Sequence, residues 1–110
     1  MKQAEIWEMY FNSVKGSEQS GRRPAVIISG NVLNDNLNIV IVCPLTTKIK
    51  AFKGNIILQP NSKNNLLKES EILTFHVRSV SKERLKQKIG VISKKDLQQI
   101  HKTLNDILRY

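Results

Sequence analysis

The chain has 110 residues, which is the size of one domain, and its 40% of hydrophobic residues excludes a disordered chain. No apolar run approaches the ~18 residues of a membrane span, and the first residues do not resemble a signal peptide. The single cysteine, Cys43, excludes an internal disulfide and a cysteine-based zinc site, so we expect one domain over residues 1–110, in the reducing cytoplasm and away from membranes. Eighteen basic and nine acidic residues give a net charge of +9, which favours a polyanionic partner such as a nucleic acid.

The first half of the chain is predicted to contain three strands. Residues 5–11 alternate, with Trp7, Met9 and Phe11 on one face and Glu8 on the other. The segments 25–29 and 39–43 are continuously apolar and β-branched, which is typical of strands covered on both faces. Residues 30–38 between them are rich in glycine, asparagine and aspartate, and this composition predicts a turn.

The second half continues the strand pattern. A strand over 55–59 is expected to end at Pro60 and to lead into a surface loop over 60–70. Residues 72–80 alternate again, which predicts a strand with Phe75 buried on one face and His76 and Arg78 on the other. The basic run 82–88 is expected to be solvated, and a short strand over 89–92 follows.

The C-terminal segment changes from strand to helix. Ser93 and Asp96 form a start that resembles a capping box. Apolar residues then recur at helical spacing, at Leu97, Ile100, Leu104, Ile107 and Leu108. Short strands closed by one amphipathic helix predict a mainly β, α+β fold: a small twisted barrel with a C-terminal helix.

The loop between the first two predicted strands, KGSEQSGRRP over residues 15–24, is the most informative segment. Pro24 restricts Arg23 to an extended conformation and holds it at the entrance of the next strand. A guanidinium in that position can grip a phosphate through two hydrogen bonds, although two arginines in a polar loop are more often merely solvated.

A second segment, CPLTTKIKAFK over residues 43–53, follows the most buried strand. Thr46 and Thr47 lie where this strand ends, and Lys48 comes directly after them. A threonine hydroxyl can donate to a phosphate oxygen, whereas the plainer interpretation is a turn built from strand-favouring threonines. This segment alone favours the turn.

Together, KGSEQSGRRPAVIIS and VCPLTTK closely resemble the MazF/PemK family of toxin endoribonucleases, and the resemblance extends over nearly the whole chain. It implies the SH3-like barrel that this family shares with the CcdB proteins. It also implies a cytoplasmic homodimer that cleaves single-stranded RNA without a metal or cofactor and is inhibited by an acidic, MazE-like antitoxin. The products implied are a 2′,3′-cyclic phosphate and a 5′-hydroxyl.

The resemblance also implies roles for particular residues. Arg23 and Thr46 match the family's catalytic arginine and threonine, and Glu18 matches the acidic residue that acts as the base. We expect the substrate to contact Gln19, Arg22, Thr47, Lys48, His76 and Arg78. His76 stands where relatives often carry glutamine, so it bears on the RNA sequence that is cleaved and not on the reaction.

Two other functions remain open at this stage. A gyrase poison of the CcdB type shares the barrel, but it has no need of Arg23, Thr46 and Glu18 together. A plain RNA-binding barrel normally displays aromatic side chains for base stacking. Aromatic residues make up only 5% of this chain, and most fall on faces that the sequence predicts to be buried.

Overall fold

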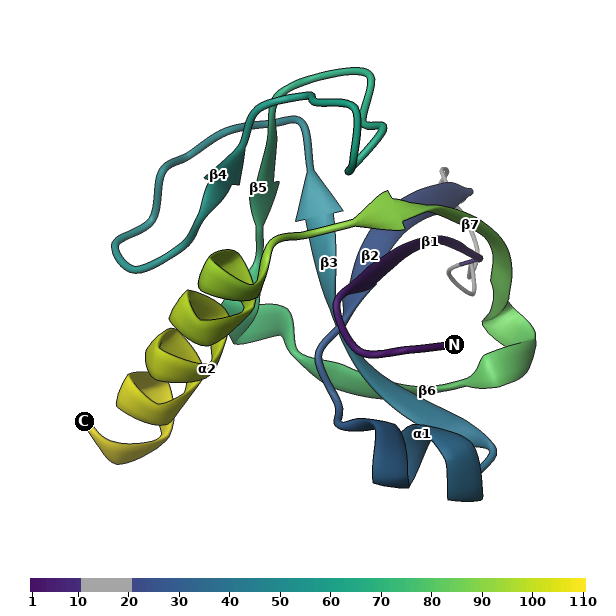
Figure 1. Cartoon of the computed structure of the whole chain (residues 1–110). Helices are drawn as coiled ribbons and strands as arrows, with labels where there is room; N and C mark the ends of the chain where they lie inside the picture. The colour runs from purple at the N-terminus through teal and green to yellow at the C-terminus, as the bar shows by residue number, and fades with distance from the viewer. Residues whose placement is uncertain (11–20) are drawn as a thin grey trace.

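The computed structural model describes residues 1–10 and 21–110, and there the chain is mainly β with a long C-terminal helix, as the sequence predicted (Figure 1). In chain order the elements are β1 (Glu5–Tyr10), β2 (Arg22–Ile27), α1 (Asn31–Asn36), β3 (Ile39–Thr46), β4 (Ile57–Leu58), β5 (Ser70–Ile72), the 3₁₀ turn η1 (Thr74–His76), β6 (Arg78–Ser81), the 3₁₀ turn η2 (Lys82–Arg84), β7 (Leu85–Val91) and α2 (Lys94–Arg109).

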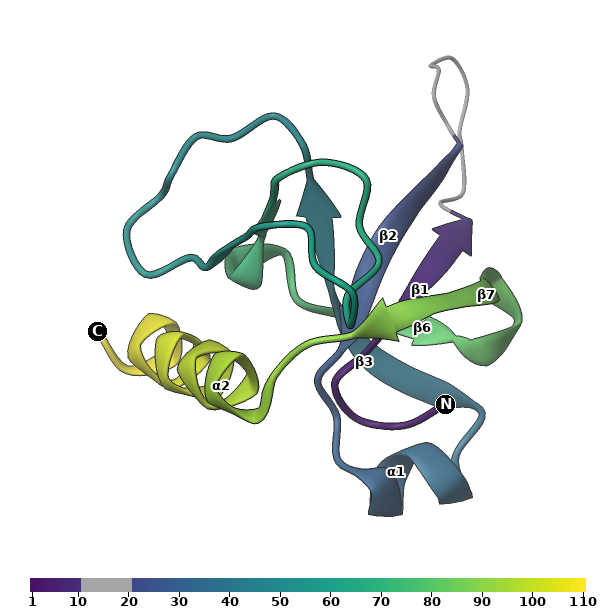
Figure 2. The same ribbon diagram turned by 45° about the horizontal axis from the view of Figure 1, so that its top comes forward.

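The strands form a curled, antiparallel sheet. Its order is β4-β5-β3-β2-β1-β7, and β6 pairs with β3 on the same edge as β5. The strands β1, β2, β6 and β7 form the curled, half-barrel part of the sheet together with β3 (Figures 1 and 2). Helix α2 lies on the other side of the sheet, below β4 and β5 (Figure 1). Helix α1 lies at the lower end of the barrel, and the carboxyl end of β3 lies at the upper end (Figure 1).

The two faces of this sheet bury two separate cores. Cys43 and Leu45 of β3 point to the face covered by α2, where Ile100 of the helix is fully buried. Val40 and Val42 alternate with them and point into the curl, where they pack with apolar residues of β1, β2, β6 and β7. A strand buried on both faces has to be continuously apolar, which explains the sequence of β3.

The alternation predicted for the first strand is confirmed in β1. Trp7 and Met9 pack on the core inside the curl, and Glu8 points to the opposite face, where it pairs with Pro24. Phe11 lies outside the described residues.

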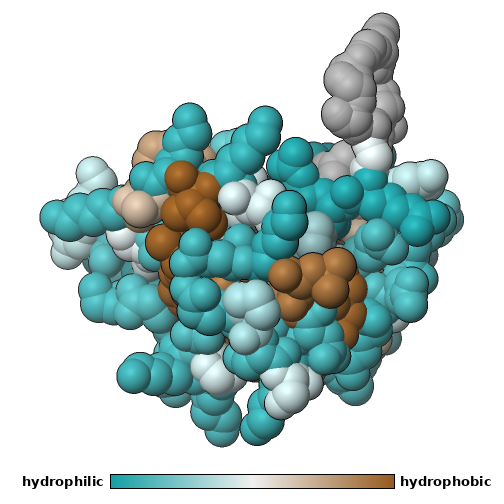
Figure 3. All heavy atoms as spheres, turned by 90° about the horizontal axis from the view of Figure 1, so that it is seen from above, coloured by the Kyte–Doolittle hydropathy of each residue, from teal (hydrophilic) through white to brown (hydrophobic). Residues whose placement is uncertain are grey.

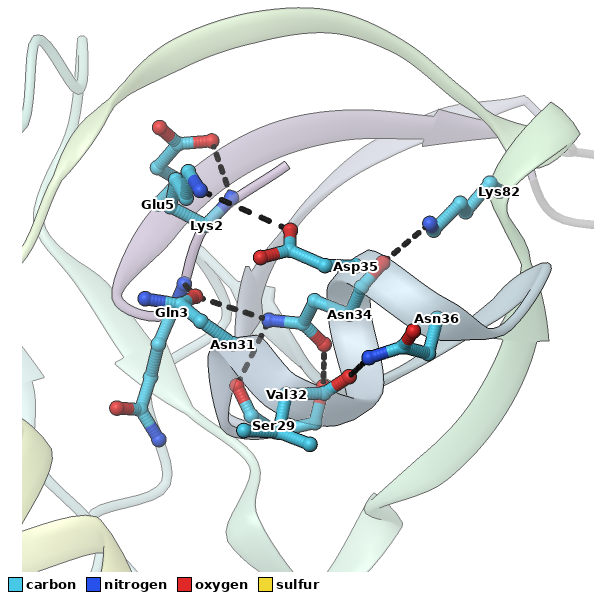
Figure 4. A network of polar contacts seen from close by, with 10 residues as sticks. All are labelled: Lys2, Gln3, Glu5, Ser29, Asn31, Val32, Asn34, Asp35, Asn36 and Lys82. Atoms are coloured by element: carbon cyan, nitrogen blue, oxygen red, sulfur yellow. Dashed lines mark hydrogen bonds and ion pairs between the residues drawn. The ribbon is translucent and has the colours of Figure 1, made fainter.

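The turn predicted over residues 30–38 is wrong, because the chain forms α1 there. The Asn34 side chain is buried and stabilises this helix by donating to the Ser29 carbonyl (2.9 Å) and accepting from the Ser29 hydroxyl (Figure 4). The Lys82 ammonium donates to the Asn34 carbonyl and ties the helix to η2. The buried Asn34 side chain thus fixes the start of an otherwise largely exposed helix, although asparagine in the sequence indicates a turn.

The single strand predicted over 72–80 is also wrong, because η1 divides this segment into β5 and β6. Leu73 donates to the Pro44 carbonyl (2.9 Å), but proline has no N–H to return to the Leu73 carbonyl. That carbonyl accepts from His76 N–H instead (3.0 Å), which forms the 3₁₀ turn. Phe75 is consequently 43% exposed and not buried as the alternation predicted.

Three smaller differences concern the surface. Strand β7 begins at Leu85, so the run 82–88 is partly an edge strand, whose lysines face solvent and protect the edge. The predicted 60–70 loop is not all surface, because Asn64 is buried and Ser70 starts β5. The predicted strand over 55–59 is reduced to the two residues of β4.

Helix α2 begins as the sequence predicted. The Ser93 hydroxyl accepts from Asp96 N–H (3.0 Å) and satisfies one of the helix's first amides. Ile100 and Thr103 are its buried residues, so the helix contacts the sheet along one stripe. Within the described residues, no helix is long and apolar enough to cross a membrane.

Candidate active site

Arg23 and Thr46 lie on the same face of the sheet, at the upper ends of neighbouring strands. Ala25 pairs directly with Pro44, and residues that pair directly point to the same face. Arg23 is two residues before Ala25 in β2, and Thr46 is two residues after Pro44 in β3, so both side chains keep that face. The two predicted catalytic residues are therefore placed together.

Arg23 is anchored in a strand and does not lie on the preceding loop. It pairs with Met9 of β1, whose side chain is fully buried beneath this end of the sheet. Arg23 itself lies in the extended backbone of β2, as predicted for the residue that precedes Pro24. Strand β2 starts at Arg22 and not at Ala25, because β1 extends far enough to pair with Arg22 and Arg23. The exposed Arg23 side chain thus projects from a fixed backbone.

Thr46 is the last residue of β3, and its hydroxyl has a defined role in the local structure. Its Oγ1 accepts from Lys48 N–H (3.1 Å), so the chain turns back at this point. A hydroxyl that accepts this bond retains its own hydrogen for donation to a ligand. The arrangement orients a donor beside the exposed Arg23.

Arg22 occupies the opposite face of β2, beside Pro24 and Glu8. Its guanidinium forms an ion pair with Glu8 (3.2 Å) and lies 5.3 Å above the centre of the Tyr10 ring. These contacts hold Arg22 against β1, so its side chain is separated by the sheet from the face of Arg23.

A pocket of about 670 Å³ lies on the Arg22 face, between the upper parts of β1, β2 and β7 and the 65–70 loop. Of the predicted substrate-binding residues that the structure describes, Thr47 alone lines it. The other lining residues are Glu8, Pro24, Asn65, Leu66, Leu67, Lys68, Ser70, Gln87, Lys88 and Ile89. The upper surface of the molecule is mostly hydrophilic, with separate apolar patches (Figure 3).

His76 and Arg78 lie farther along the other edge of β3. Arg78 pairs with Val42, which is four residues before Thr46, so about 13 Å separates these positions along the strand. Val42 faces into the curl, as Ala25 does, and Arg78 therefore shares the face of Arg23 and Thr46. His76 belongs to η1 and is exposed. The centre of its ring lies 4.7 Å from the centre of the Phe75 ring.

Sequence analysis missed a buried carboxylate next to this site. Glu71 pairs directly with Thr46 and has no exposed surface. One of its oxygens accepts from the N–H groups of Lys50 (2.8 Å) and Ala51 (2.9 Å), and the other accepts from Phe52 N–H and the Asn55 amide (both 2.9 Å). Burial alone would raise the pKa of Glu71, but these four hydrogen bonds outweigh burial and lower it.

We name this arrangement the Glu71 clamp: the Glu71 carboxylate, the Asn55 side chain and the backbone of residues 50–52. Ala51 adopts a φ of 54°, which turns its N–H and those of its neighbours toward one carboxylate. The only signal in the sequence was an acidic residue between Ser70 and Ile72, at the junction of the predicted surface loop over 60–70 and the predicted strand over 72–80. The clamp fixes the loop that follows Thr46 and Thr47.

Glu18, the predicted base, and Gln19, a predicted RNA contact, lie outside the described residues. Within residues 1–10 and 21–110, no three histidine, cysteine or acidic side chains are grouped so as to hold a metal ion.

The sequence matches the family model described as "PemK-like, MazF-like toxin of type II toxin-antitoxin system" over residues 2–108. The chain belongs to this family. It is 32% identical over 106 residues to the endoribonuclease MazF of Staphylococcus saprophyticus, a match that covers 96% of this chain and 88% of the relative. It is also 28% identical to the endoribonuclease MazF9 of Mycobacterium tuberculosis, with 94% and 92% covered.

Solved structures show the same fold. MazF of Deinococcus radiodurans superposes with a TM-score of 0.81 at 23% identity, covering 100% of this chain and 97% of that one. A MazE–MazF complex from the same organism gives 0.81 at 21% identity, with 98% and 95% covered. The expected MazF-type barrel with a C-terminal helix is therefore confirmed.

Proposed function

We propose that this MazF-type toxin is an endoribonuclease that cleaves single-stranded RNA and so inhibits translation. The observation that carries the proposal is the placement of Arg23 and Thr46 on one face, at adjoining strand ends. The endoribonuclease relatives and the net charge of +9 support it.

The chemistry proposed is an internal transfer of the phosphate. Glu18 takes the proton of the 2′-hydroxyl, and the 2′-oxygen bonds to the adjacent phosphorus while the bond from phosphorus to the 5′-oxygen breaks. The departing 5′-oxygen takes up a proton from solvent. The RNA fragments therefore end in a 2′,3′-cyclic phosphate and a 5′-hydroxyl.

Arg23 and Thr46 act on the phosphate during this step. The planar guanidinium donates to two phosphate oxygens at once, and the Thr46 hydroxyl donates to a non-bridging oxygen. Both stabilise the negative charge that develops on the five-coordinate phosphorus, and each positioned donor is worth about 3 kcal/mol. In this mechanism protein side chains carry out the reaction, and no metal is needed.

The remaining predicted residues contact the RNA around this centre. Arg78 shares the face of Arg23, so it suits a neighbouring phosphate, and Lys48 is exposed directly after the threonines. Thr47 lines the pocket on the other face, and Arg22 lies on that face paired with Glu8, so RNA that reaches them passes around the ends of β2 and β3.

We also propose two protein partners. A second copy of the chain extends the short face between Arg23 and Arg78 into a groove for several nucleotides, so we expect a homodimer. The second partner is an antitoxin whose acidic, extended segment neutralises the basic surface. The MazE–MazF complexes of Deinococcus radiodurans support an antitoxin partner. Light scattering tests the first partner, because a stable 12.6 kDa monomer at micromolar concentration contradicts it.

The decisive experiment is to incubate the purified protein with a long RNA in EDTA and to map the ends of the fragments. We expect cleavage at short recurring sequences, with a cyclic phosphate on one side and a 5′-hydroxyl on the other. Activity that vanishes in EDTA and returns with magnesium contradicts this mechanism. RNA binding without cleavage leaves a plain RNA-binding barrel, and gyrase inhibition without RNA cleavage leaves a CcdB-like poison.

A further inference from the structure

Three aromatic side chains gather on the surface where the 46–56 loop meets η1. Phe52 is 45% exposed and Phe75 is 43% exposed, and their ring centres are 5.1 Å apart in an edge-to-face arrangement. The exposed His76 ring also lies next to Phe75, with the two ring centres 4.7 Å apart. We call these three residues the aromatic cluster. It joins two loops that are more than 20 residues apart in sequence.

The Glu71 clamp holds both loops of this cluster. Glu71 accepts from Phe52 N–H (2.9 Å) and from the side-chain amide of Asn55 (2.9 Å). The side-chain oxygen of Asn55, Oδ1, accepts in turn from the N–H of Thr74 (3.4 Å), the residue before Phe75. The backbone that carries the cluster is therefore tied to one buried carboxylate. A surface fixed before binding loses little conformational entropy when a ligand arrives.

The two segments that carry the cluster are basic. Residues 46–56 contain Lys48, Lys50 and Lys53, all exposed, and no acidic residue. Residues 73–81 contain the exposed Arg78 and likewise no acidic residue. The nearby Glu71 is buried and fully hydrogen-bonded, so it offers no exposed carboxylate to repel an anion. The surface therefore suits a polyanion that carries flat apolar groups.

We propose that the aromatic cluster is a stacking platform for an unpaired base of single-stranded RNA, a proposal that rests on the RNA substrate of the proposed function. Unstacked bases pack on phenylalanine and histidine rings, and lysines beside them bind the phosphates. A second copy of this chain is less well matched, because it brings its own +9 charge to a basic surface.

The test uses a short 2′-O-methyl RNA that carries the fluorescent base 2-aminopurine, which binds without being cleaved. We expect the 2-aminopurine fluorescence to be quenched when the RNA binds to the wild-type protein, because the base stacks on the aromatic cluster. Phe52→Ala and Phe75→Ala should each lose the quenching and bind about 5- to 150-fold more weakly. Tyr110→Ala, which removes a 97% exposed ring at the C-terminus, should change neither.

A conservative series separates stacking from folding. Phe52→Trp should keep binding and quenching, whereas Phe52→Leu, which keeps an apolar side chain but lacks a ring, should behave as the alanine variant at an unchanged melting temperature. Unchanged affinity and quenching in Phe52→Leu and Phe75→Ala overturn the proposal. So does a change confined to the oligomeric state or to the binding of an acidic peptide.

Cleavage of unmodified RNA, measured in parallel, separates this proposal from the proposed function. Binding with quenching but no cleavage by the wild-type protein refutes the endoribonuclease and leaves the platform. Normal cleavage and binding in the ring-deleted variants refutes the platform and leaves the endoribonuclease.

Discussion

Glu71 lies directly opposite Thr46 in the ladder between β5 and β3, and its buried carboxylate holds the backbone of the loop that follows Thr46. Four donors converge on this group, and three of them are backbone N–H groups. The residue that ends β3 beside Arg23 and the loop that carries Phe52 are therefore fixed by one side chain.

Replacing Glu71 by glutamine should destabilise the protein by about 2–4 kcal/mol. The glutamine side chain keeps the shape, but one carboxylate oxygen becomes an NH₂ group, which cannot accept hydrogen bonds. The two N–H donors that faced that oxygen are then left buried and unsatisfied. Denaturant unfolding at neutral pH measures the loss. Glu69→Gln is the matched control, because Glu69 is exposed and should tolerate the change.

The same residue predicts how stability depends on pH. Because the folded state lowers the pKa of Glu71 below its ordinary value of 4.5, the unfolded chain binds a proton more readily. The stabilisation by Glu71 is thus fully present above pH 4.5 and is lost as the pH falls through the folded-state pKa. Calorimetry below pH 4.5 should show the wild type converging on Glu71→Gln, and a constant difference contradicts this assignment.

The sequence failed to predict two elements, the break between β5 and β6 and the helix α1, because each depends on which backbone hydrogen bonds are available in the folded chain. The break between β5 and β6 follows from the missing N–H of Pro44, a residue that lies in a different strand. Helix α1 depends on Asn34, which is buried against Ser29. Local composition does not show that Pro44 faces Leu73 or that Asn34 is buried. By contrast, β1 and α2 follow from the spacing of their apolar residues, and β3 follows from its continuous apolar run.

The candidate site divides in the same way. Arg23 and Thr46 were recognisable because their segments are distinctive and because Pro24 fixes the backbone beside Arg23. Glu71 and the exposed Phe52 and Phe75 were missed, since their positions depend on contacts between the 46–56 loop and η1. Phe75 in particular was assigned to a buried face by an alternation that the turn interrupts.

Cys43 should be inert in the folded protein. Its side chain is fully buried in the core beneath α2, and burial raises the pKa of the thiol to about 12. The thiolate is the reactive form, so a thiol reagent at pH 8 should modify Cys43 only after unfolding. Reaction with a chromogenic disulfide should be at least about 100-fold slower in buffer than in denaturant, and rapid reaction of the folded protein contradicts the burial.

Thr46→Val should slow single-turnover cleavage by about 10²-fold, because valine keeps the shape but removes the donor to the phosphate. It should cost about 1 kcal/mol of stability through the lost bond from Lys48 N–H. Thr46→Ser retains the hydroxyl and should stay near wild type. Ser62→Ala removes an exposed loop hydroxyl and serves as the control. Equal activity of the valine and serine variants removes Thr46 from the mechanism.

Antitoxin binding should weaken as salt increases, because a +9 toxin and an acidic segment attract each other through charges that salt screens. Calorimetric titration of the toxin with its antitoxin between low and physiological ionic strength measures the effect. An affinity that does not depend on salt shows that apolar contacts dominate instead.

Arg23→Lys separates catalysis from simple attraction of RNA. Lysine keeps the positive charge but loses the planar fork that donates to two phosphate oxygens at once. If Arg23 stabilises the five-coordinate phosphorus, the lysine variant should bind RNA nearly normally and cleave it about 10²- to 10³-fold more slowly in a single turnover. Because the Arg23 side chain is exposed on a paired strand, the melting temperature should hardly change. Arg109→Lys, an exposed arginine at the end of α2, is the matched control for loss of a guanidinium. Near-normal cleavage by Arg23→Lys assigns Arg23 to binding only, and a large drop in melting temperature assigns it to the fold.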